Sequence, residues 1–338
     1  MNEKASIQGA SQDGAPLVSI GIAVYNGENY LTKAIDSVFG QTFQDFEIVI
    51  CDNASTDRTR EICEDYVRRD ARVRYFCNER NLGAGPNHDL TFHRSRGSFF
   101  NWLSHDDLFA PTYLEEAVAC LKRNPDAVLC YVGIKEIGSD DKLLRIYENY
   151  LPGVDSARPS ARFAGMILHT HQCEPTFGLF RREALVGSSL HGNYPGSDRV
   201  ILAEMALRGR CVTISDPLFI HREHKDRFTR AILLGDRTKA ESEWFTDHKV
   251  KKTGARMFAL VVYRNYWRVV RQNINDNRER WACYGQLLRW WLVDRHFRSV
   301  VKNMLGYIHP ELLSRAVRIK RALFGVSAPR PGGLIHFD

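Results

Sequence analysis

Short, continuous apolar runs alternate with stretches of helical spacing over the first half of the chain. Such runs are typical of strands buried on both faces, whereas apolar residues at every third or fourth position indicate amphipathic helices. The alternation predicts an α/β fold in which helices flank a mostly parallel, Rossmann-like sheet. The predicted strands cover 17–24, 46–51, 73–76, 98–104 and 127–132, and a helical stretch follows each of the first four.

The regular alternation of apolar runs and helical stretches ends after Gly138. No apolar run reaches the length of a spanning helix and no signal-peptide pattern is present, so the sequence predicts a cytoplasmic protein with a disordered tail at 1–16. From about residue 228 onward the pattern is helical throughout. The elements predicted in between are a strand or hairpin at 142–148, helices near 159–168 and 197–208, and late strands at 211–214 and 218–220.

Short polar side chains stand at the end of each predicted strand. In open α/β sheets ligands bind beyond the carboxyl ends of the strands, so these side chains are expected to line one crevice. The adjacent carboxylates of Asp106 and Asp107 are hard oxygen ligands that suit Mg2+ or Mn2+. Capping of the following helix is the alternative explanation for this pair. The full row comprises Tyr25, Asn26, Asp52, Asn53, Asn81, Asp106 and Asp107.

The turn after the first strand argues against a dinucleotide site. It holds Tyr25-Asn26-Gly27-Glu28 where a Gly-x-Gly-x-x-Gly loop would be needed. The polar row could instead hold a base, a ribose and a metal-bound diphosphate in turn. In that arrangement Asp52 could accept the ring N–H of a pyrimidine. The residues 55–57 (Ser-Thr-Asp) are predicted to cap the second helix.

Several segments, in this order, resemble the family 2 glycosyltransferases of GT-A fold. They are "VSIGIAVYNGENYLTKAIDSVFGQTFQDFEIVICDNASTDRT", "NLGAGPNHDL" and "LSHDDLFAP", and more weakly "FGLFRREAL", "GSDRVILAEMALRGR" and "LFIHREH". The resemblance implies a GT-A catalytic domain at 17–227, followed by a helical C-terminal region at 228–338. Within the catalytic domain it implies a nucleotide-binding half at 17–137 and an acceptor half at 138–227.

The resemblance also implies which residues bind a nucleotide-sugar donor. By position, Asp52 contacts uracil or thymine, so a UDP- or dTDP-sugar is the expected donor. The Asp106-Asp107 pair resembles the end of the Asp-x-Asp metal motif, but Ser104 stands where many members have a carboxylate. Asp106 is then the main metal ligand, and the Ser104 hydroxyl faces the ribose. The expected donor site comprises Ala23, Tyr25, Asn26, Glu28, Asp52, Asn53, Asn81, Ser104, His105 and Asp106.

Asp198 matches the position of the catalytic base in that family. A base there would take the acceptor hydroxyl's proton as its oxygen attacks the anomeric carbon, and direct displacement inverts the anomeric configuration. An ordinary N-cap role is the alternative, because Asp198 precedes an amphipathic helix. His224 lies in a region where related enzymes hold the diphosphate or the metal, and a surface turn rich in histidine is the alternative explanation. The expected metal site therefore comprises Asp106, Asp107 and His224, with Mg2+ or Mn2+.

The spacing His169-x-His171-x-Cys173 superficially suggests zinc. It lacks a fourth ligand at suitable spacing, so acceptor-site or packing roles are expected for these residues.

The C-terminal region carries much of the net charge of +7. Aromatic residues and arginines interleave there with few acids. Two explanations stay open: peripheral contact with an anionic membrane surface, at the inner face of the membrane, or packing on the catalytic domain or in a homodimer. No nucleic-acid-binding module is present, so no nucleic-acid partner is expected.

Taken with these patterns, the resemblance implies an inverting transferase of glycan or polysaccharide biosynthesis. It would move a sugar from a nucleotide-diphosphate donor to a hydroxyl of a glycan, lipid-linked or small-molecule acceptor. One rival is a non-catalytic carbohydrate-binding or scaffold protein of the same fold. The other is a sugar-phosphate nucleotidyltransferase, whose expected Gly-rich, basic turn is absent after the first strand.

Overall fold

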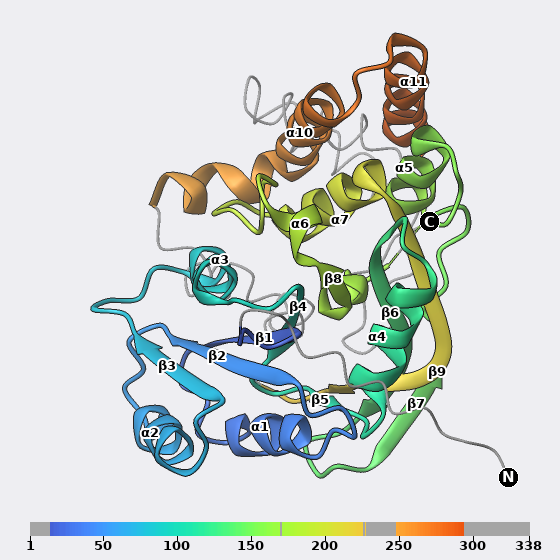
Figure 1. The fold of residues 1–338 in the computed structure, drawn as a ribbon. Helices are drawn as coiled ribbons and strands as arrows, with labels where there is room; N and C mark the ends of the chain where they lie inside the picture. The colour runs from blue at the N-terminus through green and yellow to red at the C-terminus, as the bar shows by residue number, and fades with distance from the viewer. Residues whose placement is uncertain (1–13, 170, 226, 228–247, 294–338) are drawn as a thin grey trace, which may run out of the picture. The chain divides into compact units, whose positions relative to one another are not determined.

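The computed structural model describes residues 14–169, 171–225, 227 and 248–293. The chain divides into two compact units, Met1–Leu288 and Arg289–Asp338, and the sheet belongs to the first. Within the described residues, nine strands form one mixed sheet in the order β3-β2-β1-β4-β8-β6-β9-β5, and β7 pairs with β6 (Figure 1). The strands are β1 (Val18–Val24), β2 (Phe46–Asp52), β3 (Val73–Cys77), β4 (Phe99–Ser104), β5 (Leu108–Phe109), β6 (Ala127–Ile137), β7 (Leu143–Tyr147), β8 (Leu179–Arg181) and β9 (Arg210–Arg222).

Helices connect these strands, as the sequence pattern predicts, and the α/β class with a mostly parallel sheet is confirmed. The helices are α1 (Leu31–Phe39), α2 (Thr59–Arg69), α3 (Ala84–Arg94), α4 (Tyr113–Arg123), α5 (Pro159–Leu168), α6 (Arg182–Leu185), α7 (Ser197–Arg208), α10 (His248–Asn273) and α11 (Asn277–Val293), and a 3-10 turn covers Glu174–Phe177.

The first half of the sheet is parallel and brings the predicted polar row to one edge. The strands β3, β2, β1 and β4 pair in parallel. In this register Val24 pairs with Asp52, and Ala23 pairs with Ser104. The carboxyl ends of these strands therefore meet at the same edge, which is where a ligand site is expected.

The second half departs from the prediction in several places, among them β8, which was not predicted as a strand. The two late strands are one continuous strand, β9, which runs through Pro217. Proline has no N–H to donate, and the β6–β9 register shifts between Val132 and Ile134, near Pro217, so the ladder accommodates the missing donor there. The short strand β5, which the sequence analysis did not predict, pairs antiparallel with the end of β9.

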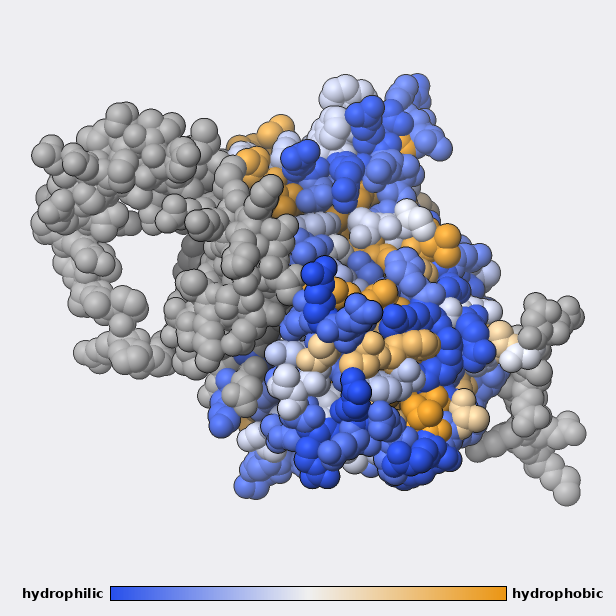
Figure 2. Space-filling view, turned by 90° about the vertical axis from the view of Figure 1, so that its left-hand side faces the viewer, coloured by the Kyte–Doolittle hydropathy of each residue, from blue (hydrophilic) through white to orange (hydrophobic). Residues whose placement is uncertain are grey.

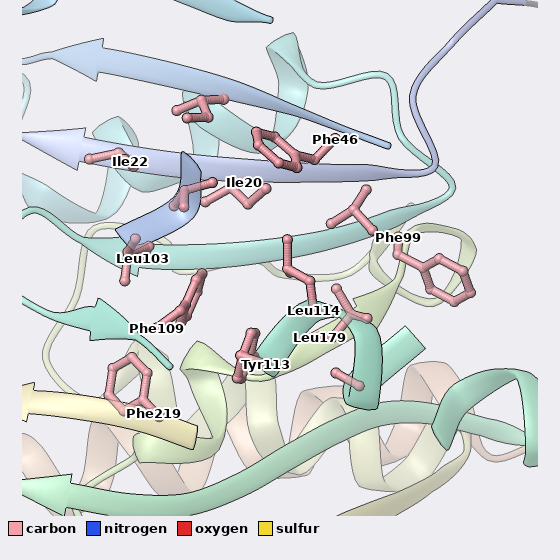
Figure 3. Close-up of a cluster of buried hydrophobic side chains, with 14 of the residues drawn as sticks. Ile20, Ile22, Phe46, Phe99, Leu103, Phe109, Tyr113, Leu114, Leu179 and Phe219 are labelled. Atoms are coloured by element: carbon pink, nitrogen blue, oxygen red, sulfur yellow. The ribbon is translucent and has the colours of Figure 1, made fainter. Parts of the chain in front are cut away.

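Apolar side chains fill both faces of the sheet. On one face, Ile20 of β1 and Leu103 of β4 belong to a cluster of buried side chains (Figure 3). The cluster also contains Phe109 of β5, Tyr113 of α4 and Phe219 of β9. The second cluster covers the opposite face and joins the sheet to α7; it includes Phe100, Trp102, Phe180, Ile201, Leu202 and Met205. The surface shown in Figure 2 is mainly hydrophilic, with small hydrophobic areas between.

Helix α10 packs against α7. Tyr266 is buried and meets Phe163 of α5 edge to face, at a centroid distance of 5.9 Å. Asn273 donates to Glu204 of α7 and accepts from Arg208. No helix in the described part of the chain is both long and apolar enough to cross a bilayer. The helices predicted across 228–247 and 294–338 lie outside the described residues, and the predicted domain boundaries, including a disordered tail at 1–16, stay predictions.

Candidate functional site

The loop after β1 is fastened to the loop after β2. The Asn26 N–H donates to Ser55 Oγ at 2.9 Å, and the Thr56 N–H donates to Asn26 Oδ1 at 2.8 Å. The Glu28 N–H donates to Asp57 Oδ2 at 3.0 Å. The prediction that Ser55, Thr56 and Asp57 cap the second helix is confirmed only for Asp57, whose Oδ1 accepts the N–H of Thr59, the first residue of α2, at 3.0 Å. The Ser55 and Thr56 side chains form no cap. These side chains instead join the two loops, because each loop has backbone N–H groups at the sheet edge that need acceptors.

Asp52 is fully buried at the end of β2. Its Oδ1 accepts the Ser55 N–H at 2.9 Å, and its Oδ2 accepts the Tyr75 hydroxyl at 2.7 Å. Burial and the neighbouring Asp52 carboxylate raise the pKa of Tyr75, so this hydroxyl stays a donor. Tyr75 was not singled out in the sequence. Each carboxylate oxygen can accept a further hydrogen bond, so a contact between Asp52 and a pyrimidine stays a prediction.

Asn53 and Asn81 hold the loop that leads into α3. The Asn53 amide nitrogen donates to Asn81 Oδ1 at 2.8 Å and to the Gly83 carbonyl at 3.2 Å. Its Oδ1 accepts the Leu82 N–H at 2.8 Å and the Asn78 amide at 3.2 Å. The Asn53 amide is thus saturated by protein groups. Direct donor contacts by Asn53 and Asn81 stay predictions.

The remaining predicted donor residues line the ends of β1 and β4. Ala23 and Ser104 are neighbours in the parallel ladder, and Tyr25 is 42% exposed at the rim. His105 packs against Gly27: a Cβ on Gly27 would lie 3.0 Å from the His105 ring. The Ser104 and His105 side chains are half-buried, so this wall of the edge is accessible to a ligand.

The Asp106-Asp107 pair does not cap a helix. Helix α4 begins at Tyr113, with Thr112 as its N-cap, and β5 intervenes. Asp107 is fully buried. Its Oδ1 accepts the Arg222 N–H at 2.9 Å and Arg227 Nη1 at 3.1 Å. The capping explanation is therefore excluded.

His224 reaches Asp106 from the segment that follows β9. Its Nε2 lies 2.8 Å from Asp106 Oδ2, and Arg227 Nη1 lies 3.5 Å from the same oxygen. Burial opposes ionisation of Asp106, but the hydrogen bond to His224 and the charges of His105 and Arg227 outweigh it and hold the pKa of this carboxyl far below its usual range. Of the predicted set, Asp106 and His224 lie together, whereas the Asp107 carboxylate is bonded to Arg222 and Arg227.

Asp106 and His224 fit a metal ion whose other coordinating atoms come mainly from a bound diphosphate. Adjacent ligands of an octahedral ion with bonds of about 2.1 Å lie roughly 3 Å apart, close to the separation of Asp106 Oδ2 and His224 Nε2. No group of three His, Cys, Asp or Glu side chains in the described residues has metal-binding geometry. Asp107 is already paired with Arg227. Two protein ligands would then need diphosphate oxygens and water to complete the shell.

Two arginines that the sequence analysis did not assign complete this cluster. Arg222 is fully buried, donates through Nε to the Asp106 carbonyl at 3.1 Å, and lies 4.9 Å from the centroid of the Tyr30 ring. It also pairs with Asp141 of the β6–β7 turn. Arg227 bridges Asp106 and Asp107. The run of basic residues after Ile220 is the sequence signal that could have found them.

Asp198 is the second residue of α7, not its N-cap. Gly196 caps the helix, with φ of 79°, and Asp198 Oδ1 accepts the Arg199 N–H at 2.8 Å. Its side chain is half-buried. Among the described residues, Asp198 forms no hydrogen bond or ion pair with Asp106 or His224.

The loop before Asp198 packs on α3, the helix that the Asn53 network positions. The His191 N–H donates to Asp89 Oδ1 at 2.9 Å. The Gly192 carbonyl lies so close to Gly85 that a Cβ there would be 2.0 Å from it. The loop that leads to α7 and the donor edge therefore share α3 as a common support.

His171 and Cys173 take part in the backbone hydrogen bonds of a turn. The His171 Nδ1 accepts the Cys173 N–H at 3.1 Å, and the opposite ring nitrogen lies 3.1 Å from the Met166 carbonyl. Burial and the charge of Arg199 lower the pKa of His171 to about 4. The neutral ring holds this turn by two backbone hydrogen bonds, which is a packing role.

Comparison with known proteins agrees with this arrangement. Residues 19–186 match the family model described as "Glycosyl transferase family 2". An uncharacterized glycosyltransferase of Rickettsia typhi is 38% identical over 135 residues, which are 39% of this chain and 40% of that protein. The chondroitin synthase of Escherichia coli is 30% identical over 142 residues, 42% of this chain and 21% of the synthase. The chain thus covers less than half the length of these relatives.

A solved structure of S. aureus TarS 1-349 in complex with UDP-GlcNAc has a TM-score of 0.59 and 17% sequence identity, and the match covers 86% of this chain and 75% of that one. This likeness establishes the fold, GT-A. Through residues 19–186, the chain belongs to glycosyl transferase family 2.

Proposed function

We propose that the protein transfers a sugar from a nucleotide diphosphate to a hydroxyl acceptor, with inversion at the anomeric carbon. The observation that carries the proposal is the convergence of Asp106 and His224. They are 118 residues apart in sequence and 2.8 Å apart at the carboxyl edge of a family 2 sheet. A carboxylate and an imidazole that together can hold a divalent metal ion, beside a row of polar strand ends, suit a metal-bound nucleotide diphosphate.

The donor we favour is a UDP- or dTDP-sugar. Asp52 would accept the ring N–H of the pyrimidine, and Ala23, Tyr25 and Glu28 would surround the nucleoside. TarS, which has the same fold, was solved with UDP-GlcNAc, and this supports the donor class. Mg2+ or Mn2+ held by Asp106 and His224 would neutralise the charge of the departing diphosphate. Asp107, paired with Arg227, would support the site from behind.

Asp198 would be the catalytic base. It would remove the proton of the acceptor hydroxyl while that oxygen forms a bond to the anomeric carbon and the bond to the diphosphate breaks. The nucleoside diphosphate leaves with the electron pair of the broken bond. A single displacement of this kind inverts the configuration and needs no protein nucleophile. The acceptor is a glycan, a lipid-linked sugar or a small molecule with a free hydroxyl.

Calorimetric titration with UDP, dTDP, GDP and ADP, each with Mn2+ and with EDTA, tests donor binding. We expect selective binding of the pyrimidine diphosphates that Mn2+ strengthens and that Asp106→Asn weakens. The matched control is Asp65→Asn, which removes a carboxylate paired with Arg68 and Arg69 on the surface of α2. Binding of none of the four nucleotides would favour the non-catalytic scaffold over a transferase.

The base is tested separately with Asp198→Asn. We expect this variant to bind the donor as the unmodified protein does and to lose transfer to the acceptor by a factor of about 10²–10⁴. Weakened donor binding with near-normal turnover would exclude Asp198 as the base.

A further inference from the structure

The helices α10 and α11 carry an exposed aromatic cluster that has no part in the proposed binding of the sugar donor. Tyr284 stacks on Trp267 at a centroid distance of 5.5 Å and meets Trp281 edge-on at 5.7 Å, so the two helices share one aromatic cluster. Trp281 is 73% exposed and Leu288 is 57% exposed. We call this surface the outer face; it comprises Arg264, Trp267, Arg268, Arg271, Arg278, Trp281, Tyr284 and Leu288.

The core does not need these side chains. The opposite side of α10 buries Tyr266, Val269 and Val270. The opposite side of α11 buries Cys283 and Leu287. Each helix therefore already has an apolar side that packs, and the exposed tryptophans form an additional apolar surface. Exposed apolar clusters of this kind usually mark a binding surface.

The charge around the outer face has one sign. Arg264, Arg268, Arg271 and Arg278 are exposed there, and Arg271 lies over the Trp267 ring at 5.9 Å. Between residues 260 and 288 the chain has only two carboxylates, Asp276 and Glu279. Asp276 lies in the turn between the helices and accepts the Glu279 N–H, while Glu279 pairs with Arg158. With Glu279 paired to Arg158, Asp276 is the carboxylate of this stretch that is left to offset the four arginines of the outer face, so the face keeps a net positive charge.

We propose that the outer face docks on an anionic lipid bilayer. Guanidinium groups pair with lipid phosphates, and tryptophan rings place an apolar body and a polar N–H at the boundary between acyl chains and headgroups. A second copy of the chain fits less well, because a two-fold dimer brings the same patch of each subunit together and would oppose arginine to arginine. The bilayer satisfies both the charge and the exposed rings.

Cosedimentation of the full chain with vesicles tests this proposal. We expect binding to mixed phosphatidylglycerol and phosphatidylcholine vesicles that falls with added salt, and little binding to phosphatidylcholine alone. Arg264→Gln/Arg271→Gln should weaken binding about 25-fold, since each arginine near an anionic surface contributes roughly fivefold. The matched control is Arg68→Gln/Arg69→Gln, which removes the same charge from exposed positions of α2 and should bind as the unmodified protein does.

Trp281→Ser tests the apolar part of the contact. This side chain is mostly exposed, so the variant should keep its unfolding midpoint but lose vesicle binding at high salt. A blue shift of tryptophan fluorescence on anionic vesicles, reduced in Trp281→Ser, would support insertion of the ring. Equal binding by the outer-face and control variants, or no binding to anionic vesicles, would overturn the proposal. So would a dimer that Trp281→Ser dissociates in the absence of lipid.

Discussion

Replacing Asp107 with asparagine should destabilise the protein through Arg227. The Asp107 side chain is fully buried and accepts hydrogen bonds from both terminal nitrogens of Arg227, at 3.1 and 3.4 Å. The arginine side chain is only 11% exposed, so it cannot recover its hydration where it lies. Removing one partner of a buried ion pair costs about 3–5 kcal/mol.

The lower end of that range is expected here. Arg227 keeps a hydrogen bond to the Arg222 carbonyl at 2.6 Å and a weaker contact with Asp106 at 3.5 Å. The asparagine amide can still accept the Arg222 N–H, but its NH2 group turned toward Arg227 would set donor against donor. We therefore expect the free energy of unfolding of Asp107→Asn to fall by about 3 kcal/mol, measured by urea denaturation without added metal.

A double-mutant cycle separates this ion pair from general damage. Arg227→Met leaves the Asp107 carboxylate buried without its cation and should also destabilise. The double variant Asp107→Asn/Arg227→Met should lose at least about 2 kcal/mol less than the sum of the single losses. Asp65→Asn, on an exposed pair, should show no measurable change. Additive single effects, or a loss below about 1 kcal/mol for Asp107→Asn, would refute the reasoning.

Two further predictions concern Gly85, which packs against the loop before α7, and His171, which holds the turn that leads to Cys173. Gly85→Ala should lower the free energy of unfolding by about 1–3 kcal/mol and reduce sugar transfer, because the added Cβ would lie 2.0 Å from the Gly192 carbonyl oxygen. The control is Gly285→Ala, which has open space around its Cβ and should leave transfer unchanged. For His171 the pKa is about 4 in the folded chain and near 6.5 when unfolded, so the folded state binds fewer protons between these values. The contribution of the neutral His171 ring to the free energy of unfolding should be fully present above pH 6.5, and the free energy should fall by about 3 kcal/mol as the pH drops to 4. Urea denaturation at several pH values measures this slope, and His171→Gln should flatten it. An unchanged slope would assign the acid sensitivity elsewhere.

The first half of the fold could be predicted because each of its segments carries one clear period. The run of β1 is buried along its whole length, with Ser19 as its one polar side chain, and the helix after β1 keeps its apolar spacing from Leu31 to Val38. In this half of the fold, tertiary contacts favour the same helices and strands as the local sequence does. The ends of those strands consequently place Asp52 and Asp106 at one edge of the sheet, as the sequence predicts.

The misses arise where local sequence and tertiary contacts disagree. Pro217 predicts a break, but β9 continues because the register shift beside it removes the need for its N–H. Ser55 has a hydroxyl that suits a helix cap, but in the structure this hydroxyl accepts the Asn26 N–H of the loop after β1. Arg227 lies 120 residues from Asp107 in sequence, and no local pattern can show which buried carboxylate a distant arginine will meet.

The charge cluster bears on how the catalytic domain is divided. The sequence predicts a nucleotide-binding half at 17–137 and an acceptor half at 138–227, yet the first half supplies Asp106 and Asp107 while the second supplies the cations that face them. Without Arg227, Asp107 would be a buried anion that keeps the Arg222 N–H as a donor, and within the described residues its remaining ion-pair partner would be a histidine 4.0 Å away, which is an unstable arrangement. The end of β9 pairs with β5 directly after the two carboxylates, so strand pairing and ion pairing fix the same geometry. The donor edge is therefore complete only when both halves are folded together.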